Sequence, residues 1–228
     1  MNKQFETIIF DFDGTLIDSA PGILNAFSAA LREVGIEAQA PLDSRLIGPP
    51  LRETLIRLSG SDDAAVIQSL SHSFKQHYDT VGVLNTKAYP GVDNMLKRFV
   101  AAGSALHLCT NKRISVTQAI LEHLGWAGEF ISVYALDMVE PRLPGKPQLL
   151  AKQIVEQGLV AEKTIYVGDK QEDGAAADAN TMAFYYAAWG YGELKKDQLK
   201  TNWTWLNHPE TLCTIAEIAA LSGGANQS

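Results

Sequence analysis

Residues 7–15 read Thr7-Ile8-Ile9-Phe10-Asp11-Phe12-Asp13-Gly14-Thr15, an apolar run followed by two acids, a glycine and a hydroxyl. The apolar part is typical of a buried strand. Side chains two residues apart share a face of an extended chain, so we expect Asp11 and Asp13 to emerge together where the strand ends. Gly14 then allows the chain to turn. Two close carboxylates repel each other unless a divalent cation lies between them or they act as nucleophile and acid.

The composition limits the classes of protein to which the chain can belong. Its 228 residues are 46% hydrophobic, which suffices for one large domain or for a core domain with a smaller insertion. The net charge is −7 and no basic stretch stands out, so we expect no nucleic-acid partner. The two cysteines, Cys109 and Cys213, form neither a disulfide framework nor a metal motif. With no signal-peptide pattern and no membrane-spanning run, we expect a cytoplasmic protein without a membrane partner, as a monomer or homodimer.

From about residue 89 onward, the predicted helices and strands alternate. Helices are predicted over residues 92–102, 115–124, 148–157 and 174–179, and strands over 105–109, 130–134, 164–167 and 183–187. This alternation indicates an α/β fold, a doubly wound parallel sheet with helices on both faces. The strand at 7–10 belongs to the same sheet.

No convincing strand is predicted between about residues 18 and 82. Ile23, Phe27 and Leu31 follow a helical spacing, and Ser19 is placed to cap that helix. Similar spacing indicates two more helices around residues 51–58 and 66–74. We therefore predict two units: a core formed by residues 1–17 and 83–228, and an inserted all-helical unit formed by residues 18–82.

Polar residues follow four of the predicted strands. These residues are Asp11 to Thr15, Thr110-Asn111-Lys112, Lys146 in the loop after the strand at 130–134, and Gly168-Asp169 with Asp173 four residues further on. Ligands bind beyond the carboxyl ends of parallel strands, so these groups should converge at one edge of the sheet. Taken singly, each also fits a turn, a surface lysine or a helix cap. Taken together, the acids, hydroxyl and lysine favour a catalytic site.

Together these four elements resemble the haloacid dehalogenase superfamily of phosphohydrolases, over about residues 7–187. The helical insertion resembles the cap domain of that family. Two loops, residues 47–51 (Ile-Gly-Pro-Pro-Leu) and 189–192 (Trp-Gly-Tyr-Gly), resemble its phosphoglycolate phosphatase-type branch. The resemblance implies a Rossmann-like core with a cap and the Mg²⁺-dependent hydrolysis of a small phosphorylated metabolite, with phosphoglycolate as the leading substrate.

The resemblance also implies a role for each acid. Asp11 is the implied nucleophile, which forms an aspartyl-phosphate and contributes an oxygen to Mg²⁺. Asp169 is implied as the second carboxylate ligand, and Asp13 as a ligand through its backbone carbonyl. Asp173 is expected to bind the metal through water or to orient the other ligands. The Asp13 side chain is the implied general acid for the leaving oxygen, and then the base for the attacking water.

The remaining site residues are expected to hold the phosphoryl group. The resemblance implies that Thr110 offers its hydroxyl to a phosphoryl oxygen, and that Lys146 sets a positive charge against that group and Asp11. The other expected substrate contacts in the core are Gly14, Thr15, Asn111 and Lys112.

The inserted helical unit is expected to select the substrate. Arg45 and Arg52 flank Gly48-Pro49-Pro50 and are candidates for binding a second anionic group, such as a carboxylate. The alternative is that both belong to a solvated helix face. Lys170 departs from the family pattern, because relatives often carry a small hydroxyl residue there; a cation at this position would weaken a neighbouring magnesium site unless it points to solvent.

Three alternative functions remain open at this stage, and a fourth, a dehalogenase, is disfavoured. A nucleotidase or pyrophosphatase would use the same core residues, and a phosphosugar mutase would share the motifs and the cap but return the phosphoryl group to a sugar. A non-catalytic regulator that binds phosphometabolites is disfavoured by the complete set of acids. A dehalogenase is disfavoured because a halide leaving group needs no acid such as Asp13.

Overall fold

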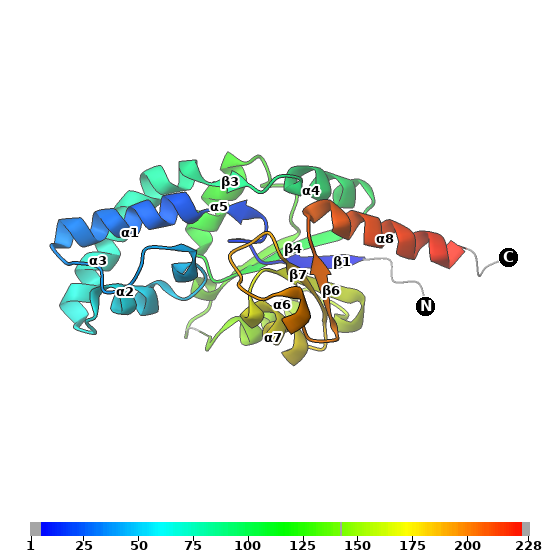
Figure 1. The fold of residues 1–228 in the computed structure, drawn as a ribbon. Helices are drawn as coiled ribbons and strands as arrows, with labels where there is room; N and C mark the ends of the chain where they lie inside the picture. Colours follow the sequence, from blue (N-terminus) through cyan, green and yellow to red (C-terminus); the bar gives the residue numbers. More distant parts are fainter. Residues whose placement is uncertain (1–5, 142, 225–228) are drawn as a thin grey trace.

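The computed structural model describes residues 6–141 and 143–224 and places six strands in one parallel sheet (Figure 1). The strand order is β5-β4-β1-β6-β7-β8. The strands are β1 (Thr7–Phe10), β4 (Ala105–Thr110), β5 (Ser132–Ala135), β6 (Thr164–Gly168), β7 (Ala183–Ala187) and β8 (Trp203–Leu206). Because β1 pairs with both β4 and β6, Asp11 leaves the sheet near its centre. The structure confirms the predicted doubly wound α/β fold.

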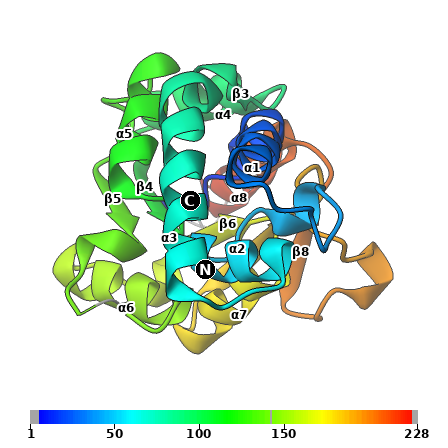
Figure 2. The same ribbon diagram turned by 90° about the vertical axis from the view of Figure 1, so that its left-hand side faces the viewer.

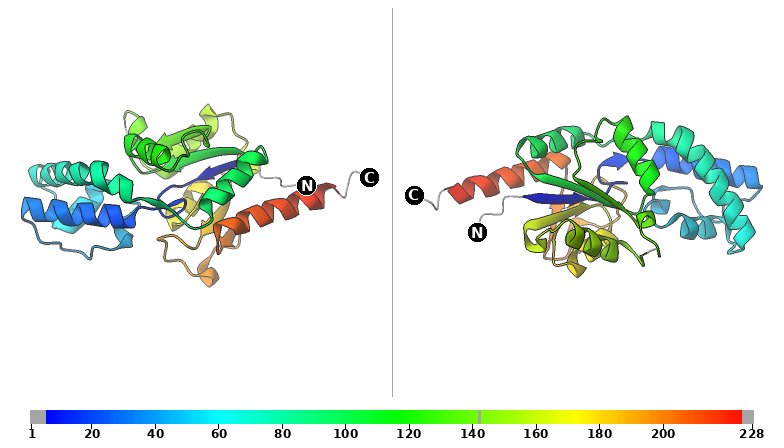
Figure 3. Two further views of the ribbon diagram at one scale, coloured as in Figure 1. Left: turned by 90° about the horizontal axis from the view of Figure 1, so that it is seen from above. Right: turned by 180° about the vertical axis from the view of Figure 1, so that it is seen from behind.

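Different helices cover the two faces of this sheet (Figures 1 and 3). Ile8 and Phe10 of β1 are buried in the cluster that includes α4 (Val92–Ala101), α5 (Ile114–His123) and α8 (Pro209–Gly224). Ile9 is buried in the opposite cluster, with α6 (Lys146–Glu156) and α7 (Gln171–Ala179). Burial on both faces explains why β1 is apolar throughout, without the alternation of a half-exposed strand.

The helices α1 (Ala20–Val34), α2 (Leu51–Ser59) and α3 (Ala64–His77) form a separate group beyond one edge of the sheet (Figures 1 and 3). Viewed from that side, they lie in front of the strands (Figure 2). The chain reaches this group through β2 (Ile17–Asp18) and returns through β3 (Lys87–Ala88), which pair with each other antiparallel. The boundaries at residues 17/18 and 82/83 remain a prediction. Among the described residues, no helix is both long enough and apolar enough to cross a lipid bilayer.

Two local predictions need correction. Ser19 precedes α1 but does not cap it, because its backbone is already helical (φ −101°, ψ −3°) and its hydroxyl donates to Asp13. The amide of Ala20, the first residue of α1, instead donates to the side chains of Asp18 and Tyr191. Lys146, predicted in a loop, is the first residue of α6. That position still follows β5 and holds the lysine at the carboxyl edge of the sheet.

Candidate active site

Three buried acids meet at the carboxyl edge of the sheet. Asp11 follows β1, Asp169 follows β6, and Asp173 lies in the first turn of α7. One carboxylate oxygen from each acid lies within 4.8 Å of the others. The pairing of the strands brings the first two together: Phe10 lies opposite Val167, and the Asp11 amide donates to the Val167 carbonyl at 2.8 Å.

Lys146 supplies a positive charge to this group of acids. Its Nζ lies 2.9 Å from Asp11 Oδ1 and 2.5 Å from Asp173 Oδ1, and the side chain is only 8% exposed. The second oxygen of Asp173 accepts the backbone N–H of Lys170 at 2.9 Å. Asp173 therefore also caps α7, and its two oxygens are held in different directions.

The electrostatics of the acids favour a divalent cation. Burial raises the pKa of Asp11 to about 7, although Lys146 acts in the opposite direction. Burial, followed by repulsion from Asp173, also raises the pKa of Asp169. Burial works against the charge of Lys146, but Asp11 and Asp173 outweigh it and hold its pKa above the usual range. Lys146 contacts two of the acids and Lys170 acts on Asp169, so three ionised carboxylates still leave a negative charge uncompensated.

These residues fit magnesium. Carboxylate oxygens are ligands that Mg²⁺ prefers, and the ion is usually bound by one or two carboxylates plus water and phosphate oxygens. Asp11 and Asp169 provide two such carboxylates on neighbouring strands. A bound divalent ion would also offset the burial and the mutual repulsion that raise the pKa values of Asp11 and Asp169.

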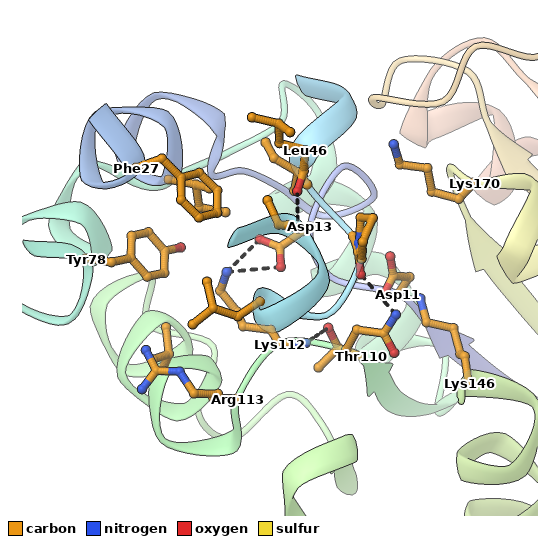
Figure 4. A pocket seen from close by; sticks show the side chains of 18 of the residues that line it. Asp11, Asp13, Phe27, Leu46, Tyr78, Thr110, Lys112, Arg113, Lys146 and Lys170 are labelled. Atoms are coloured by element: carbon orange, nitrogen blue, oxygen red, sulfur yellow. Dashed lines mark hydrogen bonds and ion pairs between the residues drawn. The ribbon is translucent and has the colours of Figure 1, made fainter. Parts of the chain in front are cut away.

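Asp13 lies apart from the three acids and belongs to a second charged group. Its carboxylate accepts Lys112 Nζ at 2.8 and 3.0 Å (Figure 4). It also accepts the hydroxyl of Ser19. The Lys112 ammonium lies 4.9 Å from the centre of the Tyr78 ring. Burial opposes the charge of Lys112, but Asp13 outweighs it and raises the pKa of the lysine. The Asp13 side chain is not among the clustered acids, and metal binding by its carbonyl remains a prediction.

Thr110 and Asn111 connect the end of β4 to the site. The Thr110 hydroxyl accepts the backbone N–H of Lys112 at 3.1 Å, which closes the turn before α5. The Asn111 amide donates to the carbonyl of Gly48 at 3.1 Å. This bond links the sheet edge directly to the loop between α1 and α2.

A cavity of about 110 Å³ lies between the sheet edge and the helices α1 to α3. Six of the residues predicted from the sequence line it: Asp11, Asp13, Thr110, Asn111, Lys112 and Lys146. Of the three clustered acids, Asp11 lines the cavity, whereas Asp169 and Asp173 do not. The cavity extends from these charged groups to apolar side chains of α1 and α3.

Four other predicted substrate residues do not line this cavity. Thr15 is buried and its hydroxyl donates to Asp169 at 3.5 Å, while Gly14 packs so closely that an added Cβ would lie 2.3 Å from Asp169 Oδ2. Arg45 is exposed and pairs with Asp43, and Arg52 lies on a different surface depression. Their proximity to Gly48 in sequence does not place them in the cavity, and their role in binding remains a prediction.

Three further residues contribute to the site without having been singled out as site residues. Tyr78, at the end of α3, lines the cavity and gives no sequence signal beyond helical spacing. Tyr191 lies in the loop at 189–192 and donates its N–H to Asp169 Oδ2 at 2.7 Å. Lys170 lines the cavity beside the acids, which shows that it does not point solely to solvent.

Known proteins resemble this chain over most of its length. A protein-family model described as haloacid dehalogenase-like hydrolase matches residues 8–187. A 5'-nucleotidase of Pseudomonas aeruginosa is 27% identical over 219 residues, which cover 96% of this chain and 94% of the relative. A phosphoglycolate phosphatase of Xanthomonas campestris pv. campestris is 33% identical over 186 residues, covering 81% and 83%.

Solved structures show the same fold. A crystal structure described as a predicted phosphoglycolate phosphatase from Haemophilus somnus 129pt has a TM-score of 0.81 with this chain. It is 24% identical and covers 93% of this chain and 98% of its own. At that identity, the likeness concerns the arrangement of helices and strands and not the substrate.

Proposed function

Because the chain belongs to the haloacid dehalogenase-like hydrolase family, we propose that it hydrolyses a small phosphomonoester with Mg²⁺, through an aspartyl-phosphate on Asp11. The observation that carries this proposal is the buried group of Asp11, Asp169 and Asp173 with Lys146, open to a cavity on the Asp11 side. A phosphoryl group placed there meets a nucleophile and a fixed positive charge.

Asp11 and Asp169 would hold Mg²⁺, and Asp173 would orient Lys146 and the start of α7. The ion would shield the charge of the substrate from that of Asp11 and polarise a phosphoryl oxygen. Lys146 keeps its own charge because of the acids around it, and so remains available to neutralise charge at the phosphoryl group.

The proposed reaction has two steps at Asp11. In the first, a carboxylate oxygen of Asp11 attacks phosphorus while the bond to the leaving oxygen breaks, and Asp13 gives that oxygen a proton. In the second, water attacks the phosphorus, Asp13 takes a proton from it, and the bond to Asp11 breaks to release phosphate. Both oxygens of Asp13 face Lys112 in this conformation, so proton delivery requires this ion pair to give way when substrate enters.

The names of the relatives do not agree on the leaving group of the substrate. One carries the name of a phosphatase for phosphoglycolate and the other of a nucleotidase. Both names describe hydrolysis of a phosphomonoester, which supports hydrolysis over phosphoryl return by a mutase. The intact Asp11 and Asp13 support catalysis over a purely regulatory role.

The proposal is tested by phosphate release from a panel of phosphorylated metabolites with Mg²⁺. We expect turnover that requires Mg²⁺ and disappears in Asp11→Asn, because the amide cannot form the acyl phosphate. Glu162→Gln removes an exposed acid far from the cavity and serves as the matched control. No release from any substrate by the wild-type protein, or equal release by Asp11→Asn, would contradict the proposal.

A further inference from the structure

The cavity has two chemically different ends. Near the sheet edge it is lined by Asp11, Lys146 and Lys170, whereas the end under the helical group is apolar (Figure 4). The apolar lining comes from α1, α3, α5 and the loop before α2: Ile23, Phe27, Leu46, Ile47, Phe74 and Val116. All six are buried. If the phosphoryl group lies at the charged end, the leaving group must extend toward this apolar end.

Aromatic rings form one wall of the apolar end. The Phe27 and Phe74 rings stack with their centres 4.5 Å apart, and Phe74 and Tyr78 with centres 5.5 Å apart. These rings join α1 to α3, so the wall is part of the packing between the two helices. Stacked aromatic side chains offer a large and rigid apolar surface to a ligand.

The cations around the cavity leave no free charge at the apolar end. Lys112 is paired with Asp13, and Arg113 donates to Asp79 at 3.0 Å. Lys146 is paired with two of the clustered acids. Lys170 has no charged partner within 4 Å among the described residues. Its side chain lies against the Gly48 loop, with Cε 3.6 Å from the place that a Cβ on Gly48 would take, and it is separated from Phe27 and Tyr78 (Figure 4). In this conformation, with Lys112 held by Asp13, a carboxylate placed against Phe27 and Phe74 would be buried among apolar side chains without a partner, which is unfavourable.

Two uncharged polar atoms of the cavity lining are buried without a hydrogen-bond partner among the described residues: the Tyr78 hydroxyl and Asn111 Oδ1. The Tyr78 hydroxyl points into the cavity (Figure 4). Burial raises the pKa of Tyr78, so this hydroxyl keeps its proton and can donate it in a hydrogen bond. Buried polar atoms normally find a partner, and a neutral polar group on a ligand would provide one.

We propose that the leaving group of the substrate is neutral, with an apolar or aromatic body against Phe27 and Phe74 and a hydroxyl or amide within reach of Tyr78. This inference rests on the proposed phosphatase function and narrows its substrate class away from a carboxylate such as that of phosphoglycolate. The volume of about 110 Å³ suits a small body, since a cavity of about 150 Å³ holds a benzene molecule.

The test compares two phosphomonoesters of nearly the same shape, 2-phosphoglycolate and isobutyl phosphate, in which two methyl groups replace the carboxylate oxygens. We expect kcat/KM with Mg²⁺ to be at least about tenfold higher for isobutyl phosphate, because burial of the methyl groups is favourable and burial of the carboxylate is not. In the series methyl, ethyl, propyl and butyl phosphate, kcat/KM should rise about fourfold per methylene until the apolar end is filled.

Binding gives a second measurement that does not depend on turnover. Calorimetry on Asp11→Asn with Mg²⁺ should show tighter binding of isobutyl phosphate than of phosphoglycolate, again by at least about tenfold. Tighter binding or faster hydrolysis of phosphoglycolate would overturn the inference and leave the proposed phosphatase function intact. Absence of turnover for every ester would instead contradict the proposed function, while the binding comparison would still decide the inference.

A charge introduced at the apolar end should reverse the preference. Leu46→Lys places an ammonium among the apolar side chains and should shift the ratio of binding constants toward phosphoglycolate by at least about tenfold. Leu42→Lys makes the same substitution at an exposed position outside the cavity, and should leave the ratio unchanged. Equal ratios in both variants would contradict the assignment of this end to the leaving group, and the wild-type comparison stands even if Leu46→Lys does not fold.

Discussion

Removal of divalent cations should destabilise the folded protein, because Lys146 pairs with only two of the three clustered acids, Asp11 and Asp173, and leaves Asp169 without an ion pair among the described residues. The pKa of Asp11 rises from 3.8 to about 7 on folding without metal, chiefly through burial. Between these values the unfolded chain has lost the proton that the folded chain still holds, so metal-free stability falls as the pH rises. For one proton this change is at most about 1.4 kcal/mol per pH unit, and the loss persists above pH 7.

Magnesium should offset this loss by binding to the folded state alone. At a concentration one hundred times its dissociation constant, a ligand adds about 2.7 kcal/mol to the free energy of unfolding. For a chain of this length, about 1 kcal/mol corresponds to roughly 2–4 °C in Tm, so the expected increase is roughly 5–11 °C. The increase should be larger at pH 8 than at pH 5.5, because protons compete with the ion for Asp11 at the lower pH.

Thermal unfolding followed by circular dichroism, in EDTA and in MgCl₂ at both pH values, measures this effect. Asp169→Asn should lose most of the increase because it removes one carboxylate from the acid group, whereas the exposed control Glu162→Gln should keep it. The same Tm with and without magnesium at pH 8 in the wild-type protein would refute the reasoning. So would a full increase in Asp169→Asn.

Two further substitutions test the residues that pair with or pack against the clustered acids. Lys146→Met leaves the buried carboxylates of Asp11 and Asp173 without their ammonium. It should lower the free energy of unfolding by about 3–5 kcal/mol in urea titrations at pH 8 with EDTA. Unchanged stability would show that the ion pairs of Lys146 contribute nothing to it. Gly190→Ala would place a Cβ 2.2 Å from the Gly14 carbonyl oxygen and 2.4 Å from Asp169 Cβ, and should weaken magnesium binding in calorimetry by about tenfold or more. Gly128→Ala, which meets no atom within 4 Å, is its control, and equal affinities in the two variants would rule out the steric argument.

The charged end of the site could be predicted from the sequence because it depends on local patterns and one topological rule. Asp11, Thr110 and Asp169 each follow an apolar strand directly, and parallel strands end at the same edge. Neighbouring residues along the chain thus become neighbours in space without any knowledge of side-chain packing. Lys146 also lies at the carboxyl edge of the sheet, as predicted, because it follows β5, although it begins a helix where a loop was expected.

The apolar end could not be predicted in the same way. Helical spacing shows that Phe27 and Phe74 face inward, but it does not distinguish a helix packed on its neighbour from a helix that lines a cavity. Arg45 and Arg52 show the opposite difficulty. They stand near a loop that lines the cavity, yet the direction of a long exposed side chain depends on the partner that it finds, and Arg45 finds Asp43.

Tyr191 explains how the two ends of the cavity are held in relation to each other. Its backbone N–H binds Asp169 at 2.7 Å, and its hydroxyl accepts the amides of Ser19 and Ala20 at 2.8 and 3.0 Å, at the start of α1. The same helix carries Phe27, so one loop residue supports both an acid of the charged end and the aromatic wall. The position of the aromatic wall relative to Asp11 is therefore supported by the core loop at 189–192 as well as by the packing of α1 on α3. A shift of α1 at its first turn would break its hydrogen bonds to the hydroxyl of Tyr191, the residue whose backbone N–H holds Asp169.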